Sequence, residues 1–541
     1  MARLRVSDPV FPPDALADGL AEVASSRLLG ARVIEEIVRS NVELHGLVAV
    51  DRAAERAIAA VHPDERAAAK LATAVARCME ARGQIIRPLE LLDHAGCALV
   101  SPRWFARLSR QARLLTDGIA ISDPGQPSYD PVPDRVIYSV AQSLPHHSSG
   151  YSIRTHWLVR HLRARGWDIS VHARFGYPND RYDFIGVGLA GNSARFDDVT
   201  YHFEPNRRGY DALDIEAYHS LCVPDLVRRA GAMRPALIHC ASNYAVGLAG
   251  VEAARRLGIP SIYEVRGLWH MTRAAGQPEY LGSDHYRLIE SLEVRAAAAA
   301  DRVLVITEAI GDVLRGHGVA PDKITVVPNA VDCKRFTRSE RDDDLARTWN
   351  VAGSTVIGYI GSFKRYEGLD DLLRAVAALR SRIGARFRVL LVGDGEAQDE
   401  LMSLAQNLGL DDLVVFTGRQ PHDQVLGFYS LVDVMAFPRK DLPLCEVVAP
   451  LKPFEAMATG TAVVASSVGA LAEMVDHETT GLVFQKGDVS DLSVQLERLV
   501  TRPELRAELA NTARQWVIEQ RSWATISDRV AAVYRDLGAG G

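Results

Sequence analysis

One stretch of this 541-residue chain decides its fold: TVIGYIGSFKRYEGLDDLLRAV, residues 355–376. It begins with an apolar, β-branched run, 355–362, and passes through a glycine-containing turn into an amphipathic segment, 369–382. A buried strand, a turn and a helix in this order form the repeating unit of a parallel sheet that helices cover on both faces. The stretch therefore predicts an α/β fold.

The same alternation continues on both sides of this stretch. Further strands are expected after it at 387–395, 413–418, 432–438, 461–469 and 480–485, and before it at 135–141, 167–174, 235–242, 260–267, 301–307 and 323–332. Helical segments separate most of these strands. We expect two Rossmann-like, doubly wound domains that face a cleft, with ligands outside the carboxyl ends of the strands.

The first part of the chain has a different pattern. Apolar residues at helical spacing in 33–44 and 65–83 predict an all-helical extension, and the proline-rich stretch 122–134 indicates a linker. A helix is also expected at 521–538, packed across the first sheet. The predicted boundaries are 1–125 for the extension, 126–340 for the first Rossmann-like domain completed by 521–541, and 341–520 for the second.

Composition excludes several classes of protein. With 62 basic and 68 acidic residues the net charge is −6, which argues against nucleic acid as a partner. No run of eighteen apolar residues predicts a membrane span, and the first residues lack the apolar core of a signal peptide. The six cysteines show no C-x-x-C pair, so we expect reduced thiols, no zinc site and a cytoplasmic location.

Glycine-containing turns after two predicted strands suit an anion. Gly361 and Gly368 flank a turn that carries Lys364 and Arg365, ahead of a helix whose N-terminus favours negative charge. Gly395, in VGDGE (392–396), suits a loop close to a ligand. An ordinary strand-to-helix turn explains the first pattern equally well, and a turn with a capping glutamate explains the second at least as well.

Two carboxylates and a cation interrupt the apolar stretch CEVVAPLKPFEAMATG, residues 445–460. Glu455, in the first turn of a short helix, suits the hydroxyls of a ribose, and Lys452 suits a diphosphate. Glu446, on the preceding loop, suits a sugar. A purely structural salt bridge between Lys452 and one of the glutamates is the alternative.

Two features of the first half also suit a ligand. In SLPHHSSGYSIRTH (143–156), Gly150 opens a helix that carries Arg154, and this loop is a candidate anion or sugar site. His239 follows a predicted strand, with a buried core histidine as the alternative. The helix 151–166 has a basic face that suits an anionic membrane surface, but packing on the sheet explains it better.

From residue 135 to the end, the ordered motifs resemble the retaining nucleotide-sugar glycosyltransferases of family 4, which have the GT-B fold. Those that carry the resemblance, besides the opening stretch, are YEVRGLW (263–269), VVPNAVD (326–332), LLVGDGE (390–396), VVFTGRQPHDQVLGFY (414–429), PLKPFEAMATGTAVVASSVGALAEMV (450–475) and TTGLVF (479–484).

The resemblance implies roles for three residues of the second half. Glu455 matches the glutamate that binds the ribose hydroxyls, and Glu446 matches the one over the donor sugar near the reacting centre. Eight residues separate them here, where seven are commoner. Arg419 lies in FTGRQ (416–420), which matches the part that holds the base.

Two departures from the family pattern concern the cations and the catalytic histidines. Ser362 and Glu367 occupy the positions of the arginine and lysine that contact the diphosphate in many relatives, so Lys452, with Lys364 or Arg365, is expected to replace them. The second histidine of H-x-H is missing, since the chain reads His239-Cys240-Ala241, and Arg266 is the candidate replacement.

The resemblance also implies an activity: transfer of a sugar from a nucleotide diphosphate sugar to an acceptor hydroxyl, with retention and without a metal or other cofactor. The implied acceptor is a lipid-linked or polysaccharide glycan of the cell envelope, with peripheral contact to the inner face of the membrane. A protein acceptor docked by the helical extension, a sugar-nucleotide epimerase and a non-catalytic binding protein are the alternatives.

Overall fold

The computed structural model describes residues 10–13, 15–26, 29–61, 65–95, 102–126, 129–184, 188–207, 209, 214–421 and 424–540. The chain divides into two compact units. The smaller comprises residues 1–120 together with Gln277–Leu292, and the larger comprises Ile121–Gly276 and Glu293–Gly541. None of the described helices has both the length and the apolar content needed to cross a bilayer.

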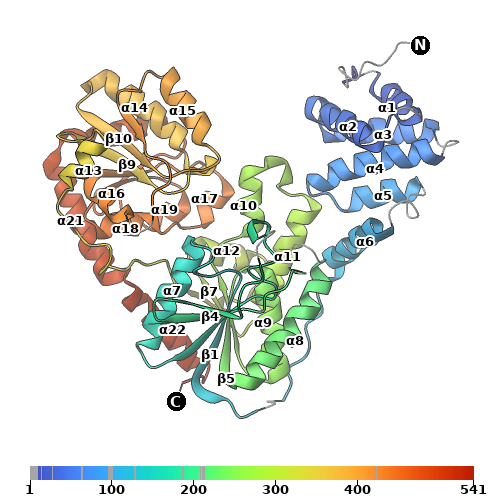
Figure 1. Ribbon diagram of the computed structural model, residues 1–541, viewed down its shortest axis with the longest axis horizontal. Coiled ribbons are helices and arrows are strands. Elements are labelled where there is room, and N and C mark those ends of the chain that lie inside the picture. Colours follow the sequence, from blue (N-terminus) through green and yellow to red (C-terminus); the bar gives the residue numbers. More distant parts are fainter. Residues whose placement is uncertain are drawn as a thin grey trace. The chain divides into compact units, whose positions relative to one another are not determined.

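The smaller unit is helical (Figure 1). Its helices are α1 (Leu16–Ser25), α2 (Ala31–His45), α3 (Leu47–Val61), α4 (Glu65–Ala81), α5 (Ile86–His94) and α6 (Pro102–Asp117). Buried apolar side chains such as Leu20, Ile34 and Leu71 form its core. The segment Gln277–Leu292 is joined to these helices through Asp284. Its carboxylate accepts hydrogen bonds from the backbone N–H groups of Ile85 and Ile86 at 2.8 and 2.9 Å.

The larger unit contains two sheets. The strands of the first are β1 (Val132–Val140), β2 (Asp168–Ala173), β3 (Ser193–Phe196), β4 (Val199–His202), β5 (Pro235–Ala241), β6 (Ser261–Val265), β7 (Arg302–Val305) and β8 (Ile324–Val326). Their order is β3-β4-β2-β1-β5-β6-β7-β8, and all neighbours are parallel except β3 and β4. The connecting helices are α7 (Gly150–Arg163), α8 (Ile215–Met233), α9 (Tyr244–Leu257), α10 (Trp269–Gly276), α11 (Asp284–Ala299), whose first turns belong to the smaller unit, and α12 (Glu308–Gly316).

The second sheet is entirely parallel, in the order β11-β10-β9-β12-β13-β14. Its strands are β9 (Thr355–Ile360), β10 (Phe387–Val392), β11 (Val414–Phe416), β12 (Val434–Phe437), β13 (Ala462–Ser466) and β14 (Leu482–Phe484). The helices around it are α13 (Asp343–Thr348), α14 (Leu369–Ile383), α15 (Gln398–Asn407), α16 (Val425–Leu431), α17 (Pro443–Val447), α18 (Lys452–Ala458), α19 (Gly469–Ala472), α20 (Val489–Thr501) and α21 (Pro503–Gln520).

Each sheet reverses its winding direction once. In the first sheet the reversal lies between β1 and β5, and in the second it lies between β9 and β12. At such a point the loops that leave two neighbouring parallel strands diverge, so a crevice opens at their carboxyl ends. The loops after β1, β5, β9 and β12 are therefore the places to look for a site.

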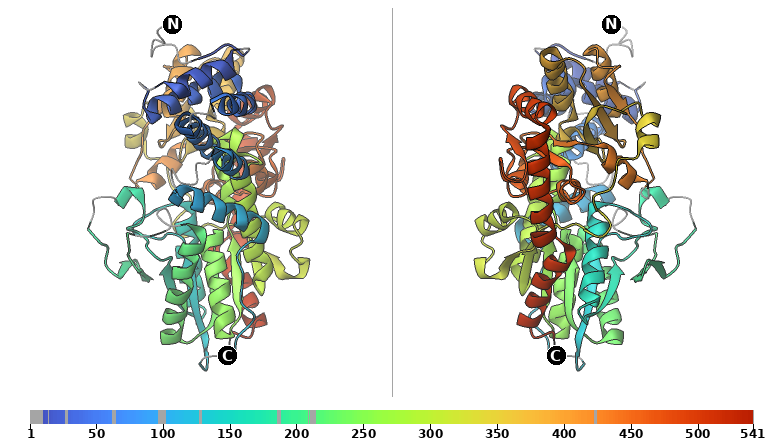
Figure 2. Two further views of the ribbon diagram at one scale, coloured as in Figure 1. Left: turned by 90° about the vertical axis from the view of Figure 1, so that its right-hand side faces the viewer. Right: turned by 90° about the vertical axis from the view of Figure 1, so that its left-hand side faces the viewer.

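The last helix, α22 (Trp523–Asp536), returns to the first sheet (red in Figure 2). Trp523 and Tyr534 lie in the core of that sheet and are almost fully buried. Backbone hydrogen bonds anchor both ends, from Val331 to the carbonyl of Arg521 and from Asp134 to the carbonyl of Ala539. The chain thus crosses back after the second sheet is complete.

The predicted fold class is confirmed: two doubly wound domains follow an all-helical region. The antiparallel hairpin β3–β4 was not predicted, because its two four-residue strands are too short for a clear alternation. The apolar side of α7 is buried, with Leu158 and Leu162 in the core of the first sheet, so packing explains this helix.

Two glycines next to helices provide a matched test of backbone constraint. Gly368, before α14, has φ +73°, and a Cβ there would lie 1.9 Å from the carbonyl oxygen of Pro438, whereas Gly409, after α15, has φ +65° with nothing within 4 Å. We expect Gly409→Ala to cost about 1 kcal/mol, from the left-handed conformation alone. Gly368→Ala should cost at least about twice that, because the Pro438 backbone must also move. Equal losses in urea unfolding of the two variants would contradict this.

Candidate functional site

The loop after β9 is built around glycines that allow other groups to come close. Backbone hydrogen bonds join Gly361 to the carbonyl of Val392 and Phe363 to that of Asp394, so the loops after β9 and β10 lie together. A Cβ on Gly361 would lie 2.3 Å from Cε of Lys452, and one on Gly395 would lie 2.6 Å from the carbonyl oxygen of Phe363. Gly361 therefore permits Lys452 to lie against the backbone of this loop, and Gly395 permits the loop after β10 to lie against it.

Lys452 is the first residue of α18, and its ammonium lies 3.5 Å from a carboxylate oxygen of Glu367 and 4.6 Å from the ring centre of Tyr359. Glu367 is buried and paired with Arg439, whose Nη2 and Nε lie 2.9 and 3.2 Å from its two oxygens. Burial opposes ionisation, but Arg439 and Lys452 outweigh it and lower the pKa of Glu367 to about 2. This triad of Glu367, Arg439 and Lys452 joins the loops after β9 and β12 with one net positive charge.

The other predicted cations of this loop have carboxylate partners elsewhere. Lys364 lies 3.1 Å from Glu396, and Arg365 lies 2.7 Å from Glu400. Both cations line a pocket of about 470 Å³ between α14 and α15. Ser362 is exposed in the same loop. Lys452 therefore lies closest to the glycine loop, and the side chains of Lys364 and Arg365 point toward α15.

Glu455 lies one turn after Lys452 in α18. Its carboxylate accepts a hydrogen bond of 2.9 Å from the hydroxyl of Tyr429, and burial raises its pKa. The side chain remains partly exposed. A fixed carboxylate with oxygen lone pairs still free can accept hydrogen bonds from hydroxyl groups.

Glu446, in α17, is held at both of its oxygens. One accepts a hydrogen bond of 2.7 Å from the backbone N–H of Gly469, and the other lies 2.8 Å from the ammonium of Lys486. Lys486 also pairs with Asp441 at 2.9 Å. About one third of the Glu446 side chain is exposed, so the carboxylate is oriented but accessible.

Arg419 is exposed in the loop after β11, directly after Gly418. Gly418 and Gly393 form an isolated β-bridge, so the loop after β11 adjoins the loop after β10. Residues 422–423 of the motif quoted for the base lie outside the described residues.

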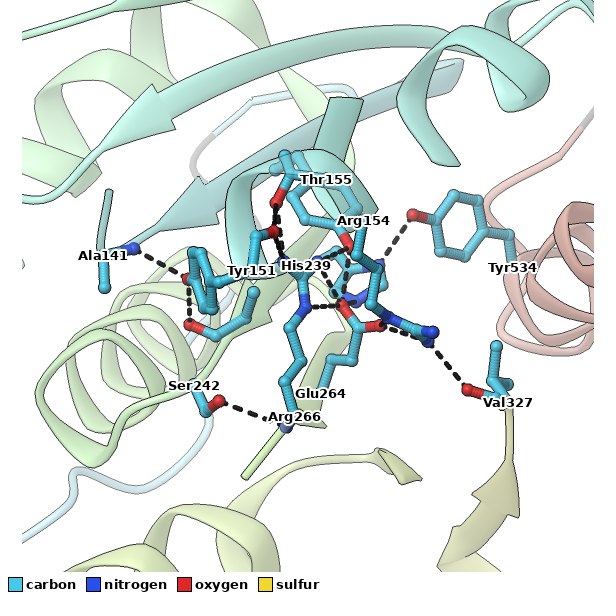
Figure 3. A network of polar contacts seen from close by, with 12 residues as sticks. Ala141, Tyr151, Arg154, Thr155, His239, Ser242, Glu264, Arg266, Val327 and Tyr534 are labelled. Carbon is cyan, nitrogen blue, oxygen red and sulfur yellow. Dashed lines mark hydrogen bonds and ion pairs between the residues drawn. The ribbon is translucent and has the colours of Figure 1, made fainter. Parts of the chain in front are cut away.

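In the first sheet, a buried ionic network occupies the point where the winding direction reverses (Figure 3). Its centre is Glu264, at the end of β6, with no exposed surface. Arg266 donates from Nη2 to this carboxylate at 2.6 Å, and Arg154 from Nε at 2.8 Å. Burial opposes ionisation, but the two guanidinium groups outweigh it and hold the pKa of Glu264 well below its ordinary value.

Both arginines use all five of their N–H donors within this network. Arg266 bonds to Glu264, Tyr138, Thr155 and the carbonyl of Tyr151, and Arg154 bonds to Glu264, Asn329 and the carbonyls of Val327 and Pro328. A guanidinium has five donors, so none remains for a ligand in this arrangement. The structure therefore places the predicted Arg154 and Arg266 in a scaffold of the first sheet.

His239 belongs to the same network and is fully buried. Its Nδ1 lies 2.7 Å from the hydroxyl of Tyr534 in α22, its Nε2 lies 3.4 Å from Glu264, and its ring stacks on Tyr138. Burial lowers its pKa, which favours the neutral imidazole. Gly150, in contrast, is exposed at the start of α7, where the side chain of Ser149 caps the helix.

Sequence reasoning missed three residues that hold the predicted carboxylates and the lysine: Arg439, Lys486 and Tyr429. Arg439 follows β12 at the reversal of the second sheet, so its place in the predicted topology was a usable signal. No pattern pointed to Lys486 or Tyr429, because their partners are 40 and 26 residues away in the sequence.

Comparisons with known proteins agree with this architecture. The family described as glycosyl transferases group 1 matches residues 341–516, and that described as glycosyltransferase family 4 matches residues 148–335. A D-inositol 3-phosphate glycosyltransferase of Saccharomonospora viridis is 33% identical over 350 residues, which cover 62% of this chain and 78% of the relative. A 2-deoxystreptamine glucosyltransferase of Streptomyces kanamyceticus is 30% identical over 280 residues, covering 50% of this chain and 70% of the relative.

Solved structures show the same fold at lower identity. A sucrose-phosphate synthase of Thermosynechococcus elongatus has a TM-score of 0.59 at 21% identity, covering 75% of this chain and 99% of that one. The HepE protein of Anabaena in complex with UDP has a TM-score of 0.58 at 18% identity, covering 74% of this chain and 100% of that one.

The pair formed by Glu367 and Arg439 gives a stability prediction. Glu367→Gln leaves the buried guanidinium without its carboxylate and should cost about 3–5 kcal/mol near neutral pH. Since folding lowers the pKa of Glu367 from 4.5 to about 2, its contribution is complete above pH 4.5 and is lost as the pH falls toward 2. In urea unfolding, the difference between wild type and variant should therefore shrink over that range. A difference that does not change with pH would contradict the pairing.

Proposed function

The chain belongs to the glycosyltransferases of group 1 and family 4, with the GT-B fold, and from this we propose that it transfers a sugar from a nucleotide diphosphate sugar to an acceptor hydroxyl with retention at the anomeric carbon. One observation carries the proposal. Lys452, against the glycine loop of β9, and Glu455, one turn later on α18, lie beside the winding reversal of the second sheet.

Each of these residues has a role that fits its chemistry. The ammonium of Lys452 binds the diphosphate, which approaches the backbone closely at Gly361. Glu455 accepts hydrogen bonds from the ribose hydroxyls, while Tyr429 fixes the carboxylate. Glu446, oriented by Gly469 and Lys486, lies over the donor sugar and aligns it.

Retention requires the acceptor to attack from the face that the diphosphate leaves. The bond between the anomeric carbon and the diphosphate oxygen breaks, and the acceptor oxygen forms the new bond on the same face. The departing diphosphate takes the proton of the acceptor hydroxyl. Lys452 balances the charge that develops on the diphosphate, which lowers the energy of the transition state, and no metal is part of this proposal.

The names of two relatives guide the choice of acceptor. D-inositol 3-phosphate and 2-deoxystreptamine are both polyhydroxylated six-membered carbon rings. The acceptors to test first are therefore of two classes: a small cyclitol, and a lipid-linked or polysaccharide glycan. With a glycan acceptor, the enzyme would contact the membrane peripherally. We assign acceptor binding to the loops after β1 and β5, around the exposed Gly150.

A thermal-shift screen with UDP, GDP, ADP and their sugars tests the proposal. We expect one nucleotide to stabilise the chain, and Glu455→Ala to remove most of that stabilisation, because each lost hydrogen bond to a charged group costs about 1.5–3 kcal/mol. Glu400→Ala, an exposed carboxylate of the same domain, is the matched control and should leave the shift unchanged. A full shift in Glu455→Ala would remove the ribose assignment. Binding without turnover on any donor would favour a non-catalytic binding protein.

A second experiment identifies the cation that binds the diphosphate. Lys452→Ala should weaken the binding of the recognised nucleoside diphosphate about 10- to 100-fold and leave the binding of the bare nucleoside almost unchanged. Lys364→Ala removes a cation paired with Glu396 and should have little effect on either. Isothermal titration calorimetry measures both. The opposite order of effects would move the diphosphate site to Lys364.

A further inference from the structure

We propose that Thr307 and Asn329, two residues of the first sheet's connections, position the donor-side groups of the second sheet by holding the chain segment between Glu446 and Lys452. This segment, residues 447–451, is called the spacer below. The proposal deepens the proposed function and rests on it, because the importance of the spacer depends on the roles of Glu446 and Lys452.

Side chains bind three successive carbonyls of the spacer. The hydroxyl of Thr307 donates to the carbonyl of Val447 at 2.6 Å, and Nη1 of Arg439 donates to that of Val448 at 2.7 Å. Nδ2 of Asn329 donates to the carbonyl of Ala449 at 2.9 Å. Residues 448–450 form neither helix nor strand, so these side chains, rather than a regular backbone ladder, fix the spacer.

The donors are themselves held rigidly. Thr307, between β7 and α12, is almost fully buried, and its hydroxyl accepts a hydrogen bond from the N–H of Ile310 as the cap of α12. Asn329, after β8, uses its other amide atom as an acceptor, since Nη1 of Arg154 lies 3.2 Å from Oδ1. Arg154 is bound in turn to Glu264. The buried network of the first sheet thus reaches the spacer through Asn329.

The spacer lies directly between the groups proposed to act on the donor. Glu446 precedes it and Lys452 follows it, so a shift of its backbone moves both side chains together. Arg439 ties the spacer to Glu367 within the second sheet, whereas Thr307 and Asn329 tie it to the first. Two hydrogen bonds from one half of the enzyme therefore align the reacting groups of the other half.

Two conservative variants of the full chain test this. Asn329→Asp keeps an acceptor for Arg154 but replaces the N–H that binds Ala449 with a carboxylate oxygen. Thr307→Val keeps the shape of the side chain and removes the hydroxyl, and Thr307→Ser restores the hydroxyl. UDP-glucose is the probe: water takes the place of the acceptor, glucose and UDP are released, and the stabilisation by UDP is measured separately.

We expect Asn329→Asp and Thr307→Val to lower kcat about 10- to 100-fold, because misplacement of about 1 Å costs this much in an aligned site. The KM for UDP-glucose should rise, and the stabilisation by UDP should fall, but both by less in free energy than kcat, because Lys452 contributes to ground-state binding whereas the transition state depends on Lys452 and Glu446 together. Thr307→Ser should recover most of the loss. Unchanged kcat would overturn the proposal, as would an equal loss of UDP stabilisation, which indicates general damage to the nucleotide half.

Hydrogen–deuterium exchange separates this proposal from the function on which it rests. Amides of residues 444–455 should exchange faster in Asn329→Asp and in Thr307→Val, while those of 369–383, in α14, should stay as in wild type. Unchanged exchange at 444–455 would overturn the positioning role whatever the enzyme's activity. A wild type that no nucleotide stabilises and that leaves every donor intact would instead overturn the proposed function.

Discussion

The need to neutralise one buried carboxylate organises the first sheet. Glu264 has no exposed surface, and an unpaired charge in that position would cost several kcal/mol. The sequence supplies two guanidinium groups, Arg154 from α7 and Arg266 from the end of β6. Because each arginine has five donors to satisfy, the pair also fixes Tyr138, Thr155, Asn329 and the backbone after β8. A single buried charge thereby joins a helix, two strands and the connection that leads to the second sheet.

The same arrangement of charges occurs at the winding reversals of both sheets, but its role differs between them. In each, one buried carboxylate faces two cations: Glu264 with Arg154 and Arg266, and Glu367 with Arg439 and Lys452. In the first reversal all guanidinium donors are used, so the network is a scaffold. In the second, Lys452 keeps part of its surface exposed beside the glycine loop. Each group of three residues thus carries one excess positive charge. In the first sheet this charge only holds the structure together, whereas in the second sheet an anion can reach it at Lys452.

The sequence predicted most of the fold, because buried parallel strands and amphipathic helices leave strong local patterns, as in 355–376. It also placed Glu455 in the first turn of a short helix, but it put Lys452 just ahead of that helix, whereas α18 begins at Lys452. Pairings over long distances were not predictable: the partner of Glu367 lies 72 residues away, and it accounts for an acid where many relatives have a lysine. Similarly, the burial of His239 under α22 depends on Tyr534, 295 residues later.

The smaller unit takes its segments from two distant parts of the chain, residues 1–120 and Gln277–Leu292. During synthesis, the helices emerge first but must wait for more than 150 further residues before Asp284 can cap the backbone at Ile85 and Ile86. Much of the first sheet is made in that interval. The buried apolar core of this region lies within residues 16–108, so its helices can pack before the cap from Asp284 forms. The smaller unit is complete only after residues 277–292 have been made. A gene fragment that ends at the linker therefore encodes only part of this unit.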